Sequence, residues 1–266
     1  MQVYEDPFVT LIMINNPTIL TSLIVFLGAV VHSIAGFGFA QVVMGLLPLI
    51  RDAQKASVIF NILAIASNAR VLWSVRKSFD LRAWGIPVIG LAVGMPVGIY
   101  LFRNLNPPQF RVGIGLTLLL AVALIISMRQ LDYIKDKIRD SGWNPGDKTA
   151  ITTGFLAGIL GGSVAIPGPP MIVYGAFLMA SNQWKGDKMK AVFTGFFGTL
   201  MTYRLLSLIW AGSVTQALAL EAVIALPALF IGSFLGIWIY EKIPEHIFQW
   251  LVIVGLTINA LILLFT

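Results

Sequence analysis

SIAGFGFAQ, residues 33–41, is a glycine-containing break inside an apolar run, and GGSVAIPGPP, residues 161–170, is a second break of the same kind. Backbone that leaves the helical conformation inside a bilayer must be buried in protein or must line a polar cavity. Two such breaks, in matching places of two halves of a membrane chain, are the best sequence indication of a substrate site. Both breaks are therefore the first candidates for a place where the chain binds a small molecule.

The composition is that of an integral membrane protein. Of the 266 residues, 58% are hydrophobic and 11% are charged, whereas soluble domains carry roughly 25% charged residues. Because the first 20 residues contain no Lys or Arg, we do not expect a signal peptide. The chain has no cysteine, which excludes disulfides, iron–sulfur clusters and thiolate metal sites. The formal charge of +6 indicates basic cytoplasmic loops, and no basic run with interleaved aromatic residues suggests a nucleic acid as partner.

The apolar segments form two sets of five, and in each set the break separates the first segment from a short second one. The first set is 18–35, 39–50, 56–75, 84–102 and 112–128, and the second is 149–165, 171–180, 191–211, 218–240 and 248–265. A helix that crosses a bilayer alone needs about 20 apolar residues, so the first two segments of each set can be the arms of a hairpin. Gly28 and Gly38 match Gly158 and Gly168 at a constant offset, which indicates a duplication.

We therefore predict an all-α integral membrane protein made of two inverted repeats. Each repeat has a broken-helix hairpin plus three transmembrane helices, which gives about eight to ten membrane segments in total. The first repeat is residues 1–128, a cytoplasmic linker is residues 129–148, and the second repeat is residues 149–266. An odd number of crossings per repeat makes the two repeats enter the membrane from opposite sides.

The distribution of basic residues predicts the orientation. Placing the loops 76–82, 129–148 and 182–190 in the cytoplasm puts most loop Lys and Arg inside, and both termini then lie in the periplasm. Some basic residues depart from this rule, because they would lie outside: Arg51, Lys55, Arg103 and Arg111.

The hairpin tips are the first candidate site, and their candidate binding residues are Gly36, Gly38, Gly168 and Pro169. A helix N-terminus offers unpaired N–H groups and the positive end of the helix dipole, which suits an anion. Glycine lets backbone approach a ligand closely, and proline fits the first turn of a helix, where no N–H is needed. The alternative is that these glycines only let helices pack or kink. The paired repetition of the break favours a site.

Arg70 and Arg204 are candidate substrate ligands inside predicted spans. A charge at the centre of a membrane helix costs about 3 kcal/mol, so it usually faces a cavity or a partner. No acidic residue lies within one helical turn of either arginine, and a small oxyanion is a natural bidentate partner for a guanidinium. The alternative is that the long side chains extend to the membrane interface, because both residues lie near helix ends.

Three neutral polar residues complete the candidate site. His32 lies one turn before the first break and could bind an anion when protonated or carry a coupled proton, although a lone His is more often a packing residue. Gln41 and Asn68 could donate hydrogen bonds to a substrate or, alternatively, to a neighbouring helix. We predict no metal and no other cofactor, because the two His residues are far apart and the carboxylates are not clustered. The sequence contains no catalytic-triad spacing and no nucleotide-binding loop, so we do not predict an enzyme.

The chain resembles the TauE/SafE sulfite exporter family, also called the TSUP family, over nearly its whole length. The resemblance rests on the length, the duplicated architecture, Gly36-Phe37-Gly38-Phe39 leading to Leu47-Pro48-Leu49, and Gly168-Pro169-Pro170. It implies transport of small sulfur-containing anions, such as sulfite, thiosulfate or C2 sulfonates, across the bacterial inner membrane. The chain departs from the commoner family pattern at 167–170, where many members have a longer glycine run, and this leaves the exact substrate and the direction open.

From these observations we expect a secondary transporter of a small organosulfur anion, coupled to H⁺ or Na⁺, with alternating access around the two hairpin tips. Arg70 and Arg204 would neutralise the substrate, and His32 would carry the proton. The alternatives are a carboxylate or inorganic anion as cargo, an uncoupled channel, a scaffold, and a membrane-embedded enzyme. A homodimer is possible, because the glycine-rich stretches 90–98 and 232–236 could form a dimer face or an internal contact.

Overall fold

The computed structural model describes residues 16–35, 38–129, 145–240 and 245–265, and within these residues it contains helices, turns and no strand. The first half holds α2 (Asn16–Ala35), α3 (Phe39–Leu46), α4 (Ala53–Val75), α5 (Leu81–Asn104) and α6 (Pro107–Arg129). The second half holds α8 (Asp147–Val164), α9 (Gly168–Ala180), α10 (Gly186–Trp210), α11 (Gln216–Tyr240) and α12 (Glu245–Phe265). Short 3₁₀ turns follow α3 (Leu47–Leu49) and α4 (Arg76–Ser78). Each predicted apolar segment is a helix.

Five described helices are long and apolar enough to cross a membrane: α4, α5, α6, α10 and α11. Their apolar surfaces face outward, and they include fully or largely exposed side chains such as Trp210 and Phe234. In water such a surface would be unfavourable, whereas lipid tails solvate it. The chain is therefore an all-α membrane protein, as the composition predicts.

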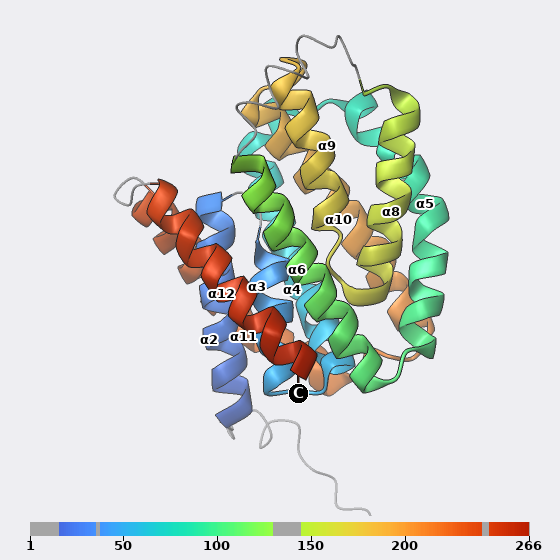
Figure 1. Ribbon diagram of the computed structural model, residues 1–266. Coiled ribbons are helices and arrows are strands. Elements are labelled where there is room, and N and C mark those ends of the chain that lie inside the picture. Colours follow the sequence, from blue (N-terminus) through green and yellow to red (C-terminus); the bar gives the residue numbers. More distant parts are fainter. Residues whose placement is uncertain (1–15, 36–37, 130–144, 241–244, 266) are drawn as a thin grey trace, which may run out of the picture.

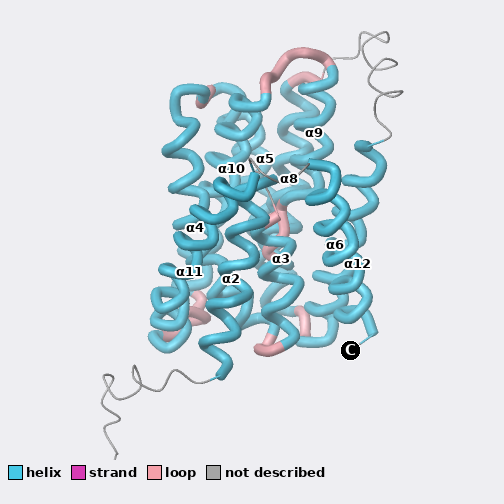
Figure 2. The backbone as a smooth tube through the Cα atoms, turned by 90° about the vertical axis from the view of Figure 1, so that its left-hand side faces the viewer, coloured by secondary structure: helices cyan, strands magenta, loops and turns pink. Residues whose placement is uncertain are grey.

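The two hairpins enter the bundle from opposite ends. Figure 1 shows α8 descending from the upper end of the bundle and α9 returning to it, while α2 rises from the lower end and α3 returns there. Figure 2 shows the turn between α8 and α9 inside the bundle rather than at either end. Residues 36–37, which include the candidate Gly36, lie outside the described residues. The second break thus falls near the middle of the molecule.

Local sequence explains where the long helices of the first half begin. The Asp52 carboxylate accepts hydrogen bonds from the backbone N–H groups of Gln54 and Lys55 and caps α4. Asp80 caps α5 in the same way and also accepts a hydrogen bond from Lys188 Nζ at 2.7 Å. The hydrogen bond from Lys188, followed by those from the backbone, lowers the pKa of the Asp80 carboxyl. This pair joins the start of α5 to the start of α10.

The glycine-rich faces are internal contacts. A Cβ added to Gly94 would overlap the backbone of Phe155, so α5 and α8 touch backbone to backbone. A Cβ added to Gly236 on α11 would lie 2.6 Å from the Val30 carbonyl oxygen on α2. Close approach of this kind needs residues without a side chain at the contact. The structure therefore shows that these glycine-rich stretches form contacts inside the bundle. Dimerisation stays a prediction.

Each half packs against the other half through equivalent helices. The first helix of each half packs along the fourth helix of the other half: α2 along α11, and α8 along α5. The third helices, α4 and α10, pack on each other, and so do the fifth, α6 and α12. Inverted repeats predict this exchange, although the duplication itself, with its boundaries at 128 and 149, stays a prediction.

The loops predicted to be cytoplasmic share one end of the bundle. The connections around 76–80 and 181–185, and the described ends on either side of 130–144, all lie at the upper end in Figure 1. The C-terminus and the connections at 50–52, 105–106 and 211–215 lie at the lower end. This arrangement agrees with the predicted crossings, and the side of the membrane stays a prediction.

Candidate functional site

One cavity lies where the two hairpin tips meet. It offers about 50 Å³ of space accessible to water, which is room for several water molecules or one small oxyanion. Gly38 comes from the first tip, and Pro167 and Gly168 come from the second. The structure therefore brings together two breaks, at Gly38 and Gly168, that are 130 positions apart in the chain.

The first tip presents several backbone donors. Gly38 has φ 102° and ψ −10°, in the left-handed region that favours glycine, and it precedes the first turn of α3 without a side-chain cap. The first N–H paired within the helix is that of Val42, which donates to the Gly38 carbonyl oxygen. Within the described residues, the N–H groups of Phe39, Ala40 and Gln41 are thus the unpaired donors of a helix N-terminus, and these residues line the cavity.

The second tip has fewer donors. Pro167 precedes α9 without a side-chain cap, and Pro169 and Pro170 follow Gly168 in the first turn. Since proline has no N–H, Gly168 supplies the donor of this tip. Pro169 is buried and does not line the cavity, so its place fits a helix start rather than a direct contact. The preceding helix, α8, ends at Val164 and is followed by Ala165, which has φ 64°.

Two buried polar side chains at the cavity have no hydrogen-bond partner among the described residues. His32 is 7% exposed and neither ring nitrogen has a partner, and Ser67 is 2% exposed with an unpartnered hydroxyl. Leaving a buried polar group unpaired costs about 1–3 kcal/mol, so such groups usually meet water or a ligand. Ser67 was missed in the sequence, where its only signal was its position beside Asn68.

Gln41 and Asn68 also line the cavity. Asn68 Nδ2 donates to the Ala64 carbonyl oxygen at 2.8 Å, which leaves its own amide oxygen for other contacts. Gln41 reaches from the first tip to the second, because its Nε2 lies 2.9 Å from the place where a Cβ on Gly168 would be. The absence of a side chain at residue 168 lets the two tips approach each other.

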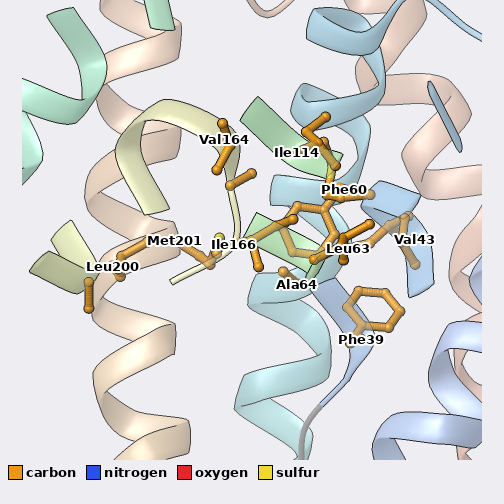
Figure 3. Close-up of a cluster of buried hydrophobic side chains, with 14 of the residues drawn as sticks. Phe39, Val43, Phe60, Leu63, Ala64, Ile114, Val164, Ile166, Leu200 and Met201 are labelled. Atoms are coloured by element: carbon orange, nitrogen blue, oxygen red, sulfur yellow. The ribbon is translucent and has the colours of Figure 1, made fainter. Parts of the chain in front are cut away.

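Aromatic and aliphatic side chains form the rest of the wall. Phe39, Phe60, Ala64 and Met201 line the cavity and belong to the buried cluster drawn in Figure 3. The ring centroids of Phe39 and Phe60 are 5.6 Å apart. Because the described residues of the lining include no Asp, Glu, Lys or Arg, the site is a weakly polar chamber in which a few hydrogen-bond donors act at low dielectric.

The two candidate arginines do not line this cavity. Arg204 has no exposed surface, and its Nε donates to the Gly162 carbonyl oxygen at 3.2 Å. Its other nitrogens donate to Ser57 and Asn61 on α4. Arg70 is half-buried, with its guanidinium carbon 5.1 Å from the centroid of the Phe234 ring. Direct substrate binding by either arginine stays a prediction without support from this geometry.

Comparison with known proteins shows the family of the chain. The model of the family described as sulfite exporter TauE/SafE matches residues 21–263. The chain belongs to the TauE/SafE family. The match covers both hairpins, so the resemblance drawn from the glycine and proline motifs is confirmed. Membership makes the protein a multi-pass membrane transporter.

One curated TauE/SafE relative is the "Probable sulfite/organosulfonate exporter TauE" of Cupriavidus necator. It is 25% identical over 211 residues, which are 79% of this chain and 78% of that protein. No solved structure is significantly similar to the chain.

Proposed function

We propose that the protein carries a small sulfur-containing organic anion, such as a C2 sulfonate or a sulfite-like oxyanion, across the bacterial inner membrane. The family and the name of the Cupriavidus necator relative support this class of cargo. The basic loops at one end of the bundle support a cytoplasmic position for that end and a periplasmic position for both termini.

The cavity between the hairpin tips is the observation that carries the proposal. It combines the N-terminus of α3, the N–H of Gly168, and the unpaired polar groups of His32 and Ser67. Helix N-termini favour anions, and hydroxyl and imidazole groups bind the oxygens of a sulfonate. A cavity of this size inside a membrane bundle suits a small oxyanion better than a large organic substrate.

The same geometry supports alternating access. The two hairpins reach the cavity from opposite ends, so a shift of one hairpin relative to its half of the bundle would open the cavity to one side at a time. Coupling would use H⁺ or Na⁺. His32 is our candidate proton carrier, because it is the titratable side chain among the described residues of the lining.

Uptake and counterflow in proteoliposomes test the function. The panel contains sulfite, thiosulfate, ethanesulfonate and matching carboxylates, each with and without a proton or a sodium gradient. We expect saturable counterflow of a sulfur oxyanion and accumulation driven by one of the two gradients. Conduction without saturation or counterflow would instead indicate a channel, and movement of carboxylates alone would change the cargo.

Ser67→Ala should weaken substrate binding without harming the fold. Its hydroxyl has no partner to lose within the described part of the chain, whereas a hydrogen bond to a charged ligand contributes about 1.5–3 kcal/mol, so we expect affinity to fall about tenfold or more. Ser233→Ala on α11 is the matched control, because Ser233 is also 2% exposed and does not line the cavity. Equal affinities in both variants would remove Ser67 from the site.

A further inference from the structure

Arg204 is a buried cation held by neutral groups. Its Nε donates to the Gly162 carbonyl oxygen at 3.2 Å, and its Nη1 donates to the carbonyl oxygen of Ser57 at 3.4 Å and to Asn61 Oδ1 at 3.3 Å. Its Nη2 donates to the Ser57 hydroxyl at 3.3 Å. The guanidinium carbon also lies 4.9 Å from the centroid of the Phe102 ring. All three nitrogens are thus engaged with the protein.

No acidic side chain among the described residues forms an ion pair with this guanidinium. The acidic residues whose side chains the structure describes lie at or near helix starts: Asp52, Asp80, Asp147, Asp187 and Glu221. The one of these that is buried, Glu221, is paired with Arg51 at 2.6 Å. Buried charges are usually matched by an opposite charge. Among the side chains that the structure describes, no carboxylate therefore matches the charge of Arg204.

Arg204 is connected to the cavity through its own helix, α10, and through α4 and α8, two of the helices that it contacts. On α10, Met201 lines the cavity one turn before Arg204. On α4, Phe60 lines the cavity next to Asn61. On α8, Gly162 lies two residues before Val164, where the helix ends at the second tip. The guanidinium is thus beside the cavity without contacting its interior.

We propose that Arg204 is a positioning and selectivity residue: it holds the end of α8 against α4, and its unmatched charge makes the central cavity prefer anions without contacting the substrate. This inference rests on the proposed function, because it concerns the same cavity. A unit charge about 10 Å from a bound anion changes its affinity on the order of tenfold at an effective dielectric constant near 20. That effect is large enough to measure.

Asn61→Asp and Arg204→Lys separate the effect of the Arg204 charge from the effect of its hydrogen bonds. Asn61→Asp keeps an acceptor oxygen near Arg204 Nη1 and adds the missing negative charge, so the guanidinium stays in place while the net charge disappears. Asn61→Ala is the control, because Asn61 Nδ2 also donates to the Met201 carbonyl oxygen at 2.8 Å, and both variants lose that bond. Arg204→Lys keeps the charge and loses the fork of donors that joins α8 to α4.

Calorimetric titration of the purified protein with ethanesulfonate, and with the neutral ethyl methyl sulfone as a probe of shape, reads out the charge effect. We expect Asn61→Asp to bind ethanesulfonate about tenfold more weakly than Asn61→Ala, with the affinity for the sulfone unchanged between them. We expect Arg204→Lys to keep its preference for the anion over the sulfone and to lose thermal stability.

Each outcome has one meaning. Equal ethanesulfonate affinity of Asn61→Asp and Asn61→Ala, in variants that unfold at similar temperatures, would overturn the charge effect and leave the proposed transport intact. Loss of anion preference in Arg204→Lys would overturn it as well, because the charge is still present. Failure of the unmodified protein to bind any anion of the panel would overturn the proposed function, and the inference with it.

Discussion

At the scale of single residues, the backbone of Gly38 decides the shape of the first hairpin tip. Its φ of 102° lies in a region that side chains with a Cβ rarely adopt, and an added Cβ would also lie 3.0 Å from Val31 Cγ1. We predict that Gly38→Ala lowers the free energy of unfolding by about 1–2 kcal/mol, measured by thermal unfolding in detergent. Gly255→Ala is the control, because that helical position has no atom within 4 Å of an added Cβ and should be neutral or stabilising.

The second tip makes a different demand on its glycine. Gly168 lies in the first turn of α9, and the atom that an added Cβ would meet there is the flexible end of Gln41. A substitution at Gly168 therefore displaces a cavity side chain rather than straining the backbone.

If Gly38→Ala proved as stable as Gly255→Ala, the described conformation of the first tip would be wrong.

At the scale of helices, the contact between α5 and α8 depends on the faces that glycine leaves bare. We predict that Gly90→Ala strongly destabilises the protein, because the added Cβ would overlap the Ile151 carbonyl group of α8. Gly85→Ala, on the same helix, should be neutral or stabilising by about 0.5–1 kcal/mol, because nothing lies within 4 Å of an added Cβ there. Unfolding temperatures of the two variants check the prediction. Similar values would contradict the close packing of these helices.

At the scale of the whole molecule, the ends of the bundle divide the loops into two groups with opposite access. The chain has no cysteine, so single cysteines report sidedness without background. We predict that cysteines at Gly146 and Gly186 react with an impermeant thiol reagent only from the cytoplasm, and those at Asn106 and Thr215 only from the periplasm. All four positions are exposed in the structure. Labelling of intact cells and of inside-out vesicles distinguishes the groups, and a mixed pattern within either group would contradict the crossings.

Several features of the molecule followed from the sequence alone. Membrane insertion, the helical segments that the structure describes and both hairpin breaks were predicted because they depend on hydrophobicity over about 20 neighbouring residues and on the local backbone preferences of glycine and proline. His32, Gln41, Asn68 and the tip glycines Gly38 and Gly168 were named because they lie at or near the breaks or in the adjoining span. The family followed from motifs that the whole chain carries.

Only the tertiary structure decided which of these groups share a cavity. It added Ser67 to the wall and separated Arg204, which is held by residues up to 147 positions away, from the half-buried Arg70. It also showed that the glycine-rich faces of α5 and α11 are internal contacts. The physical reason is that a side chain's environment depends on the rotation of each helix and on the distant helix that it meets, and neither is encoded in neighbouring residues.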